Sequence, residues 1–157
     1  MDWQRLFECS HLDWMKVGIT MGNGIAGGTW DDLYLKFDNG TKYEFEVVDQ
    51  PYRGHDYAVE VNITEGFSAP VVPVKDLRSF SIISHSHNGN SGDEWELGTL
   101  VLYGRCAGSK KEVIIDKFDN IYDWYDRNRG FARKMDPADW HLVDPATGRH
   151  TTDPGDF

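Results

Sequence analysis

Two histidines separated by one residue, His85 and His87, form the pattern in this chain that is best suited to metal chemistry. Alternate residues of a strand point to the same side, so both imidazoles would face one ion. Asp93 and Glu94 follow closely, and carboxylates combined with imidazoles suit a divalent metal. The segment 85–93 is polar and contains glycine, which predicts an exposed loop where solvated histidines are also common. These four residues are therefore the candidate metal ligands.

A second pattern, Gly-Asn-Gly-Ile-Ala-Gly from Gly22 to Gly27, matches the G-x-G-x-x-G spacing of dinucleotide-binding loops. In those proteins the loop opens a helix whose N-terminus holds the pyrophosphate. Here the residues from Trp30 to Phe37 alternate with a period of two, which is typical of a strand. The sequence therefore predicts a glycine-rich loop at 22–28 between two strands and no site for NAD or ATP.

Nucleophilic catalysis has little support in the sequence. Cys9 and His11 are close in sequence, but this proximity does not place a base against a thiol. A G-x-S-x-G turn does not occur. We assign no catalytic residue and no cofactor on this basis, and the sequence favours a protein without enzymatic activity.

Aromatic residues stand beside acidic residues in two segments, one directly after the glycine loop and one at 121–129. Tyrosine and tryptophan supply much of the binding energy of protein interfaces, whereas charges mainly raise the association rate and select the partner. An alternative for the second segment is that Ile121 and Trp124 dock it onto the sheet. The predicted partner-binding residues are Trp30, Asp31, Asp32, Tyr122, Asp123, Tyr125 and Asp126.

The charge of the chain restricts its partners. With 26 acidic and 16 basic residues among 157, the net charge is −10, so phosphate backbones and anionic membranes repel the protein. An acidic surface suits a basic protein partner instead.

The N-terminus carries an acid early and lacks a long apolar stretch, so we expect no secretion signal and a cytoplasmic location. In that compartment Cys9 and Cys106 are expected to be reduced thiols.

The segment from Leu33 to Val47 predicts a β-hairpin. A three-residue loop at 38–40 would pair Leu35 with Tyr43 and Leu33 with Phe45, which gives one apolar face. Such a loop needs a left-handed residue, and Gly40 adopts that conformation without strain.

Further periodic segments predict a mostly β (α+β) fold: a bent antiparallel sheet or small β-barrel of about six to eight strands, with a short helix at each end. Residues 1–135 would form this single domain, and 136–157 an Asp/Pro-rich tail whose end is disordered. The expected strands are 15–21, 31–37, 41–48, 57–63, 71–74, 80–83, 95–103 and 112–118, and the expected helices are 3–10 and about 120–129.

Two functions remain open at this point. The first is a small acidic cytoplasmic binding protein of the inhibitor or immunity type, which acts on a larger protein partner. The alternative is a β-barrel that binds a small molecule or a divalent metal, with possible enzymatic activity, through the loops 22–28 and 85–94. The sequence leaves the oligomeric state and the identity of the partner open.

Overall fold

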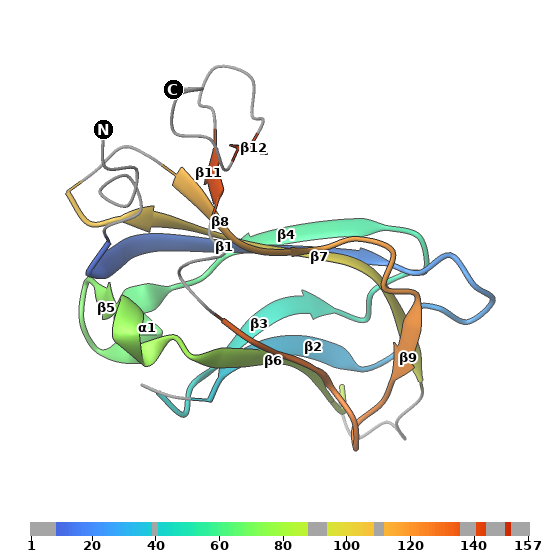
Figure 1. The fold of residues 1–157 in the computed structure, drawn as a ribbon. Helices are drawn as coiled ribbons and strands as arrows, with labels where there is room; N and C mark the ends of the chain where they lie inside the picture. Colours follow the sequence, from blue (N-terminus) through green and yellow to red (C-terminus); the bar gives the residue numbers. More distant parts are fainter. Residues whose placement is uncertain are drawn as a thin grey trace.

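The computed structural model describes residues 9–38, 41–87, 94–108, 112–135, 141–143 and 150–151. These residues are mostly β and form two antiparallel sheets. Figure 1 shows the sheets as two layers that face each other. Within the described ranges the sheets do not close into the barrel that was one of the two predicted architectures.

The larger sheet contains the first strand of the fold next to one of its edge strands. Its order is β12 (His150–Thr151), β11 (His141–Val143), β8 (Glu112–Phe118), β7 (Trp95–Cys106), β1 (His11–Met21) and β4 (Asp56–Glu60). The short strand β5 (Val72–Pro73) pairs with β1, and β9 (Asp123–Tyr125) pairs with β7.

The smaller sheet has the order β10 (Phe131–Lys134), β6 (Ser79–His85), β2 (Asp32–Phe37) and β3 (Glu44–Asp49). Two short helices complete the described elements: α1 (Ile63–Phe67) and the 3-10 helix η2 (Val74–Asp76). The predicted strands are thus confirmed in outline, although most differ from their predicted ends by a few residues.

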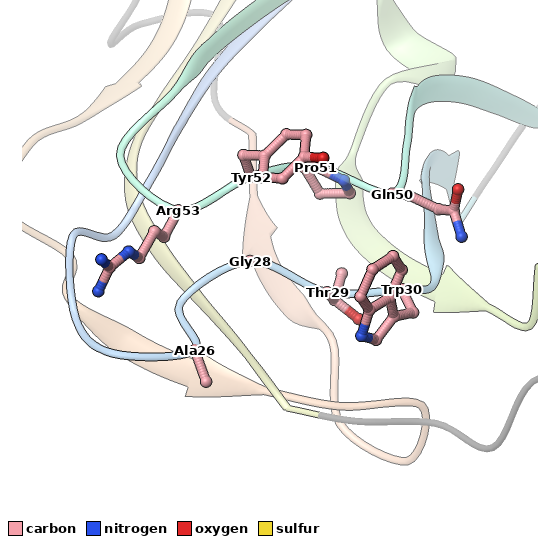
Figure 2. A pocket seen from close by; sticks show the side chains of 8 residues that line it. All are labelled: Ala26, Gly28, Thr29, Trp30, Gln50, Pro51, Tyr52 and Arg53. Carbon is pink, nitrogen blue, oxygen red and sulfur yellow. The ribbon is translucent and has the colours of Figure 1, made fainter.

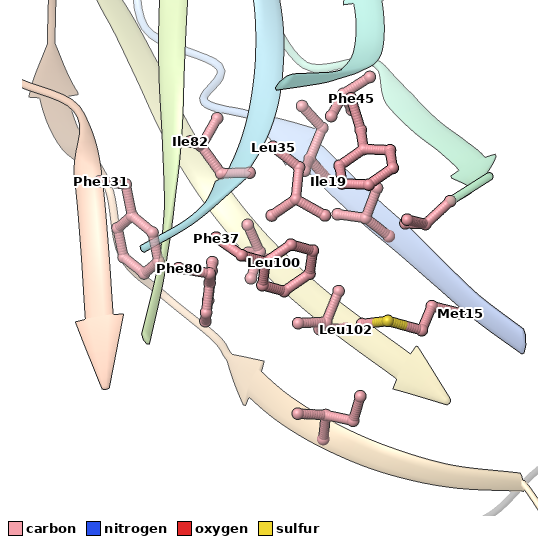
Figure 3. Packing of buried hydrophobic residues seen from close by; sticks show 14 of the residues in the cluster. Met15, Ile19, Leu35, Phe37, Phe45, Phe80, Ile82, Leu100, Leu102 and Phe131 are labelled. Atoms are coloured by element: carbon pink, nitrogen blue, oxygen red, sulfur yellow. The ribbon is translucent and has the colours of Figure 1, made fainter. Parts of the chain in front are cut away.

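The core lies between the two sheets and follows from alternation along each strand. Most side chains that point inward are apolar, and most of the charged side chains point outward, as a period of two allows. Figure 3 shows this packing, with rings and aliphatic chains from both layers in contact. The buried residues labelled there are Met15, Ile19, Leu35, Phe37, Phe45, Phe80, Ile82, Leu100, Leu102 and Phe131.

The predicted hairpin forms, but its register differs from the prediction by two residues at Leu35 and by three at Leu33. Leu35 pairs with Phe45 rather than with Tyr43, and a bulge places Leu33 opposite Val48. Leu33, Leu35 and Phe45 are buried as predicted, whereas the prediction that Tyr43 lies on the same buried face is wrong. Tyr43 is 37% exposed. The predicted turn residues Asn39 and Gly40 lie outside the described residues.

Helix α1 explains this longer hairpin connection. The predicted strand 57–63 ends at Glu60, and Asn62 caps a helix there by accepting a hydrogen bond from the Glu65 N–H at 3.1 Å. The hydroxyl of Tyr43 donates to the Glu65 carboxylate at 2.6 Å. The α1 helix therefore holds the end of the hairpin, a tertiary contact that the local pattern does not contain.

The predicted C-terminal helix is wrong. Residues 123–125 form strand β9, which pairs with the start of β7, and a turn leads directly into β10. Asn120 and Tyr122 have φ values of 55° and 43°, which a right-handed helix does not allow. Asp126 stabilises the turn by accepting from the backbone N–H groups of Asn128 and Arg129. Most of the predicted N-terminal helix 3–10 lies outside the described residues.

The prediction of reduced thiols is also wrong, because Cys9 and Cys106 form a disulfide. The antiparallel pairing of β1 and β7 places Cys106 opposite Leu12, which brings the two cysteines together across 97 residues of sequence.

Among the described residues, no helix is long and apolar enough to span a bilayer. The boundary predicted at 135/136 stays a prediction, although β11 and β12 extend the larger sheet beyond it.

Candidate functional site

Three connections meet at one end of the two layers, and we call this surface the loop end: residues 22–31 between β1 and β2, 50–55 between β3 and β4, and 119–122 before β9. Backbone hydrogen bonds join the first two connections, from the Thr29 N–H to the Pro51 carbonyl at 3.0 Å and from the Gly54 N–H to the Gly22 carbonyl at 3.0 Å. Figure 1 shows the three connections at the same end of the molecule, beside β9.

The glycines of the loop end allow close packing of the backbone. Glu96 is buried, and its carboxylate accepts a hydrogen bond from the Gly24 N–H at 3.0 Å. A Cβ atom on Gly22 would lie 2.1 Å from the carboxylate of Glu96, and one on Gly28 would lie 2.4 Å from the Pro51 carbonyl oxygen. The loop leads into strand β2 as predicted, so its glycines fit a packed β-sheet connection rather than a phosphate-binding helix turn.

An ion pair between a buried carboxylate and a partly exposed guanidinium fixes the loop end to the turn that follows β9. Asp31 is fully buried, and Arg127 donates to both of its carboxylate oxygens, at 2.8 and 2.9 Å. Two parallel hydrogen bonds of this kind define the position of both side chains. Asp31, a predicted partner-binding residue, therefore lies beneath the surface and holds the loop end together.

Exposed aromatic residues surround a shallow pocket at this end. Trp30 is 64% exposed and Tyr52 is 68% exposed, although large aromatic side chains are usually well buried. Between them lies a pocket of about 310 Å³, shown in Figure 2. The lining residues are Ala26, Gly28, Thr29, Trp30, Gln50, Pro51, Tyr52 and Arg53.

The loop end concentrates exposed apolar surface. Among the described residues, Ile25 (87% exposed) and Tyr122 (57%) belong to it together with Trp30 and Tyr52, whereas Tyr43 belongs to the opposite end. Four of the five exposed large hydrophobic residues thus gather on three neighbouring connections. Clustered exposure of this kind makes the loop end the candidate interaction surface, because single exposed apolar residues are ordinary on protein surfaces.

The remaining predicted residues near Tyr122 have structural contacts. Tyr125 is 4% exposed and packs against Trp95, with ring centroids 5.2 Å apart. Asp123 binds the Arg129 guanidinium at 2.9 Å. The backbone N–H of Trp124 and then this guanidinium hold the pKa of Asp123 below its usual value of 3.8.

Carboxylates and histidines gather on the outer face of β2, β3 and β6. Among them, Asp32 is buried and lies at the start of β2, directly opposite Asp49 on β3. A hydrogen bond to Asp49, together with burial, raises the pKa of Glu46 above its usual value of 4.5. Burial and the surrounding carboxylates also raise the pKa of Tyr34. The outer face is therefore strongly acidic beside the loop end.

The two predicted metal-binding histidines face different carboxylates. The Nε2 atom of His85 lies 2.9 Å from Glu44, and the Nδ1 atom of His87 lies 2.9 Å from Asp32. Glu94 is exposed, and Asp93 lies outside the described residues. Each imidazole thus has its own acidic partner in this structure.

Sequence reasoning missed Ile25, Tyr52 and Arg53 at the loop end and Asp49 on the acidic face. A signal for Tyr52 was present, because it follows Pro51 in a turn-rich connection where an aromatic side chain has little chance of burial. Asp49 offered no local signal. Its position opposite Asp32 depends on the bulge in β3, which only the assembled hairpin shows.

No family model and no curated protein matches this chain. Solved structures do show the fold. An alpha toxin from Clostridium absonum matches 80% of this chain with a TM-score of 0.55 and 15% identity, and the alpha-toxin of Clostridium perfringens gives 0.53 and 15%. A lipoxygenase in complex with arachidonate matches 78% with a TM-score of 0.52 and 12% identity.

The chain spans only 31–32% of the two toxins and 16% of the lipoxygenase. The matching parts of those proteins are C2-like β-sandwich domains. At such low identity the likeness shows the fold alone, a two-sheet β-sandwich. The site must therefore be interpreted from its own residues.

Proposed function

We propose that this chain is a non-enzymatic binding protein that holds a larger protein partner with its loop end, as an inhibitor or immunity protein does. The observation that carries the proposal is the gathering of Ile25, Trp30, Tyr52 and Tyr122 on neighbouring connections. Binding would bury these side chains, and tryptophan and tyrosine are enriched among the residues that dominate interface energies.

The acidic surroundings favour a basic partner. Asp49 directly precedes the connection that carries Tyr52, Glu46 lies on the same strand, and the whole chain has a net charge of −10. Carboxylates around an aromatic centre would attract a basic surface over a distance and would repel acidic proteins. Close packing of the loop-end backbone supports the proposal, because a preorganised surface loses less conformational entropy on binding.

A second candidate is a small molecule bound between Trp30 and Tyr52. The pocket of about 310 Å³ favours it, although this volume is at the lower limit of small-molecule sites, roughly 300 to 1,000 Å³. Gln50 and Arg53 would supply polar contacts. A shallow surface between two exposed rings suits an inserted side chain of a protein partner better than an enclosed ligand.

Affinity capture with matched variants tests the proposal. The immobilised chain is compared with a Trp30→Ala/Tyr52→Ala double variant and with Tyr43→Ala, which removes an exposed ring from the opposite end. We expect one protein that the wild type and Tyr43→Ala retain equally and that the double variant retains at least about tenfold less. Its association should slow as salt rises from about 50 to about 300 mM.

Equal retention by all three proteins, or a partner whose binding does not respond to salt, would contradict the proposal. Capture of a low-molecular-mass compound that the double variant loses would replace it with the second candidate. Mass spectrometry of the eluted material separates these outcomes. Circular dichroism of each variant confirms that its fold is retained.

The cellular location belongs to the same proposal. The sequence favoured the cytoplasm, but cytoplasmic thiols are kept reduced, and the Cys9–Cys106 disulfide is typical of an oxidising compartment. We therefore infer that the partner is met under oxidising conditions. Alkylation of free thiols in freshly lysed source cells checks this inference, because labelled cysteines would restore the cytoplasmic assignment.

A further inference from the structure

We propose that Asp32, Asp49 and His87 form a binding site for a divalent transition metal, for which Zn²⁺ is the probe. One ligand atom from each residue lies within 4.8 Å of the other two. The proposed set contains only one of the two histidines of the His-Ser-His pattern. The site shares Asp49 with the acidic surroundings of the loop end, but it is argued from metal-ligand geometry and the protein-binding proposal from exposed aromatic residues, so either proposal can fail alone.

Three neighbouring strands of the smaller sheet position these residues. Asp32 on β2 lies directly opposite Asp49 on β3 and, on its other side, opposite His85 on β6. His87 follows β6 by two residues, and its Nδ1 atom lies 2.9 and 3.0 Å from the two carboxylate oxygens of Asp32. Because Asp32 and Asp49 lie within paired strands, their backbones need little rearrangement on binding.

The charges at this place favour a cation. Like charges directly opposite each other in an antiparallel pair are destabilising, and Asp32 and Asp49 are such a pair. The side chain of Asp32 is only 10% exposed, so water compensates its charge poorly. Within the described ranges no lysine or arginine forms an ion pair with either carboxylate, and the ion pair of Asp32 is with His87. A divalent ion would offset both negative charges.

The donor set selects the class of metal. Ca²⁺ and Mg²⁺ take oxygen ligands, whereas an imidazole nitrogen together with carboxylates suits Zn²⁺ and its neighbours in the first transition row. With ligand bonds of roughly 2.0–2.2 Å, the ion would enter between the His87 nitrogen and the Asp32 oxygen, which are 2.9 Å apart and would separate slightly, while Asp49 would approach to complete the set. The second imidazole–carboxylate pair, His85 with Glu44, lies on the same face but offers only two donors, which makes it a matched control.

Calorimetric titration of the full chain with ZnCl₂ in chelator-treated buffer tests the site. We expect one Zn²⁺ per chain in the wild type and in His85→Ala, with equal affinity. His87→Ala and Asp49→Asn should each weaken binding at least about tenfold. These two positions are less buried than Asp32, so their substitution removes a ligand without opening the core. Imidazole NMR should show a Zn²⁺-dependent shift of the His87 resonances and none for His85.

Several outcomes would overturn the site. They are unchanged Zn²⁺ affinity in correctly folded His87→Ala, equal weakening by His85→Ala, or no heat of binding at millimolar Zn²⁺. Ca²⁺ binding as tight as Zn²⁺ binding would contradict the nitrogen-containing donor set.

Discussion

The carboxylate of Asp31 has no contact with solvent, and both of its oxygens accept hydrogen bonds from Arg127. Removing the charge of Asp31 weakens two hydrogen bonds inside the protein and leaves the Arg127 guanidinium, whose side chain is 32% exposed, compensated only in part by water, which is destabilising. Asp31→Asn keeps the shape and removes the charge. We therefore expect the free energy of unfolding to fall by about 2–3 kcal/mol in urea denaturation.

Asp123→Asn is the control for this experiment, because it removes the same group from the solvent-exposed pair with Arg129. Surface ion pairs contribute little, so its midpoint of denaturation should remain close to that of the wild type. Equal losses of stability in the two variants would show that the contribution of Asp31 to stability does not depend on its burial.

At the scale of single residues, the sequence identified chemical types but not their surroundings. Trp30, Asp31 and Asp32 are consecutive, and sequence reasoning gave all three the same role. The structure places Trp30 in solvent, Asp31 in an ion pair beneath the surface, and Asp32 beside His87. These differences arise from contacts that no local pattern contains: His87 lies 55 positions after Asp32, and Arg127 lies 96 positions after Asp31.

The glycine-rich connection provides the test at the scale of elements. A Cβ atom on Gly28 would meet the Pro51 carbonyl oxygen at 2.4 Å and the Arg53 nitrogen at 2.8 Å, both backbone atoms. Gly28→Ala must therefore separate two connections of the loop end. We expect a loss of about 1–3 kcal/mol in thermal or urea denaturation, as for other overpacked sites.

Gly18→Ala is the matched control, because its nearest contact would be the Tyr57 carbonyl oxygen at 3.9 Å, an ordinary distance. In the middle of strand β1, alanine should leave stability unchanged or slightly increase it. If Gly28→Ala were as stable as Gly18→Ala, the close packing of the loop end would be refuted.

Sequence periodicity predicted the elements that are long and amphipathic. Strands β1, β2, β6, β7 and β8 all lie where alternation placed them. Periodicity failed at 121–129, because the aromatic residues of this segment fit the period of a helix as well as that of a strand. Pairing with β7 makes residues 123–125 a strand. Periodicity also gave a hairpin register wrong by two residues at Leu35 and by three at Leu33, because local alternation contains neither the bulge in β3 nor the contact between α1 and Tyr43.

At the scale of the whole molecule, the disulfide joins the start of β1 to the end of β7 across 97 residues. Closing so long a loop restricts the unfolded chain, which stabilises the folded state by about 2–5 kcal/mol. The Cys9→Ser/Cys106→Ser double variant should therefore unfold at a lower urea concentration. Wild-type protein treated with reductant should match the double variant.

Identical midpoints for the oxidised protein, the reduced protein and the double variant would contradict this expectation.

The antiparallel, mostly β class was predictable from composition and alternation. The division into two sheets was not, because it depends on which strands pair across long stretches of sequence. The same holds for the disulfide, since Cys9 and Cys106 become neighbours only through the pairing of β1 with β7.

In the loop end, the close-packed glycines cannot be substituted without a clash, whereas the exposed residues between them can be substituted. Gly22, Gly27 and Gly28 have no room for a side chain, whereas Asn23 and Ile25 between them are exposed. Substitutions that alter recognition can therefore accumulate at the exposed sites while the backbone keeps its path. A library varied at Asn23, Ile25, Trp30, Tyr52 and Arg53 would present new side chains on an unchanged scaffold. The loop end is in this respect a surface suited to directed evolution of new binding specificities.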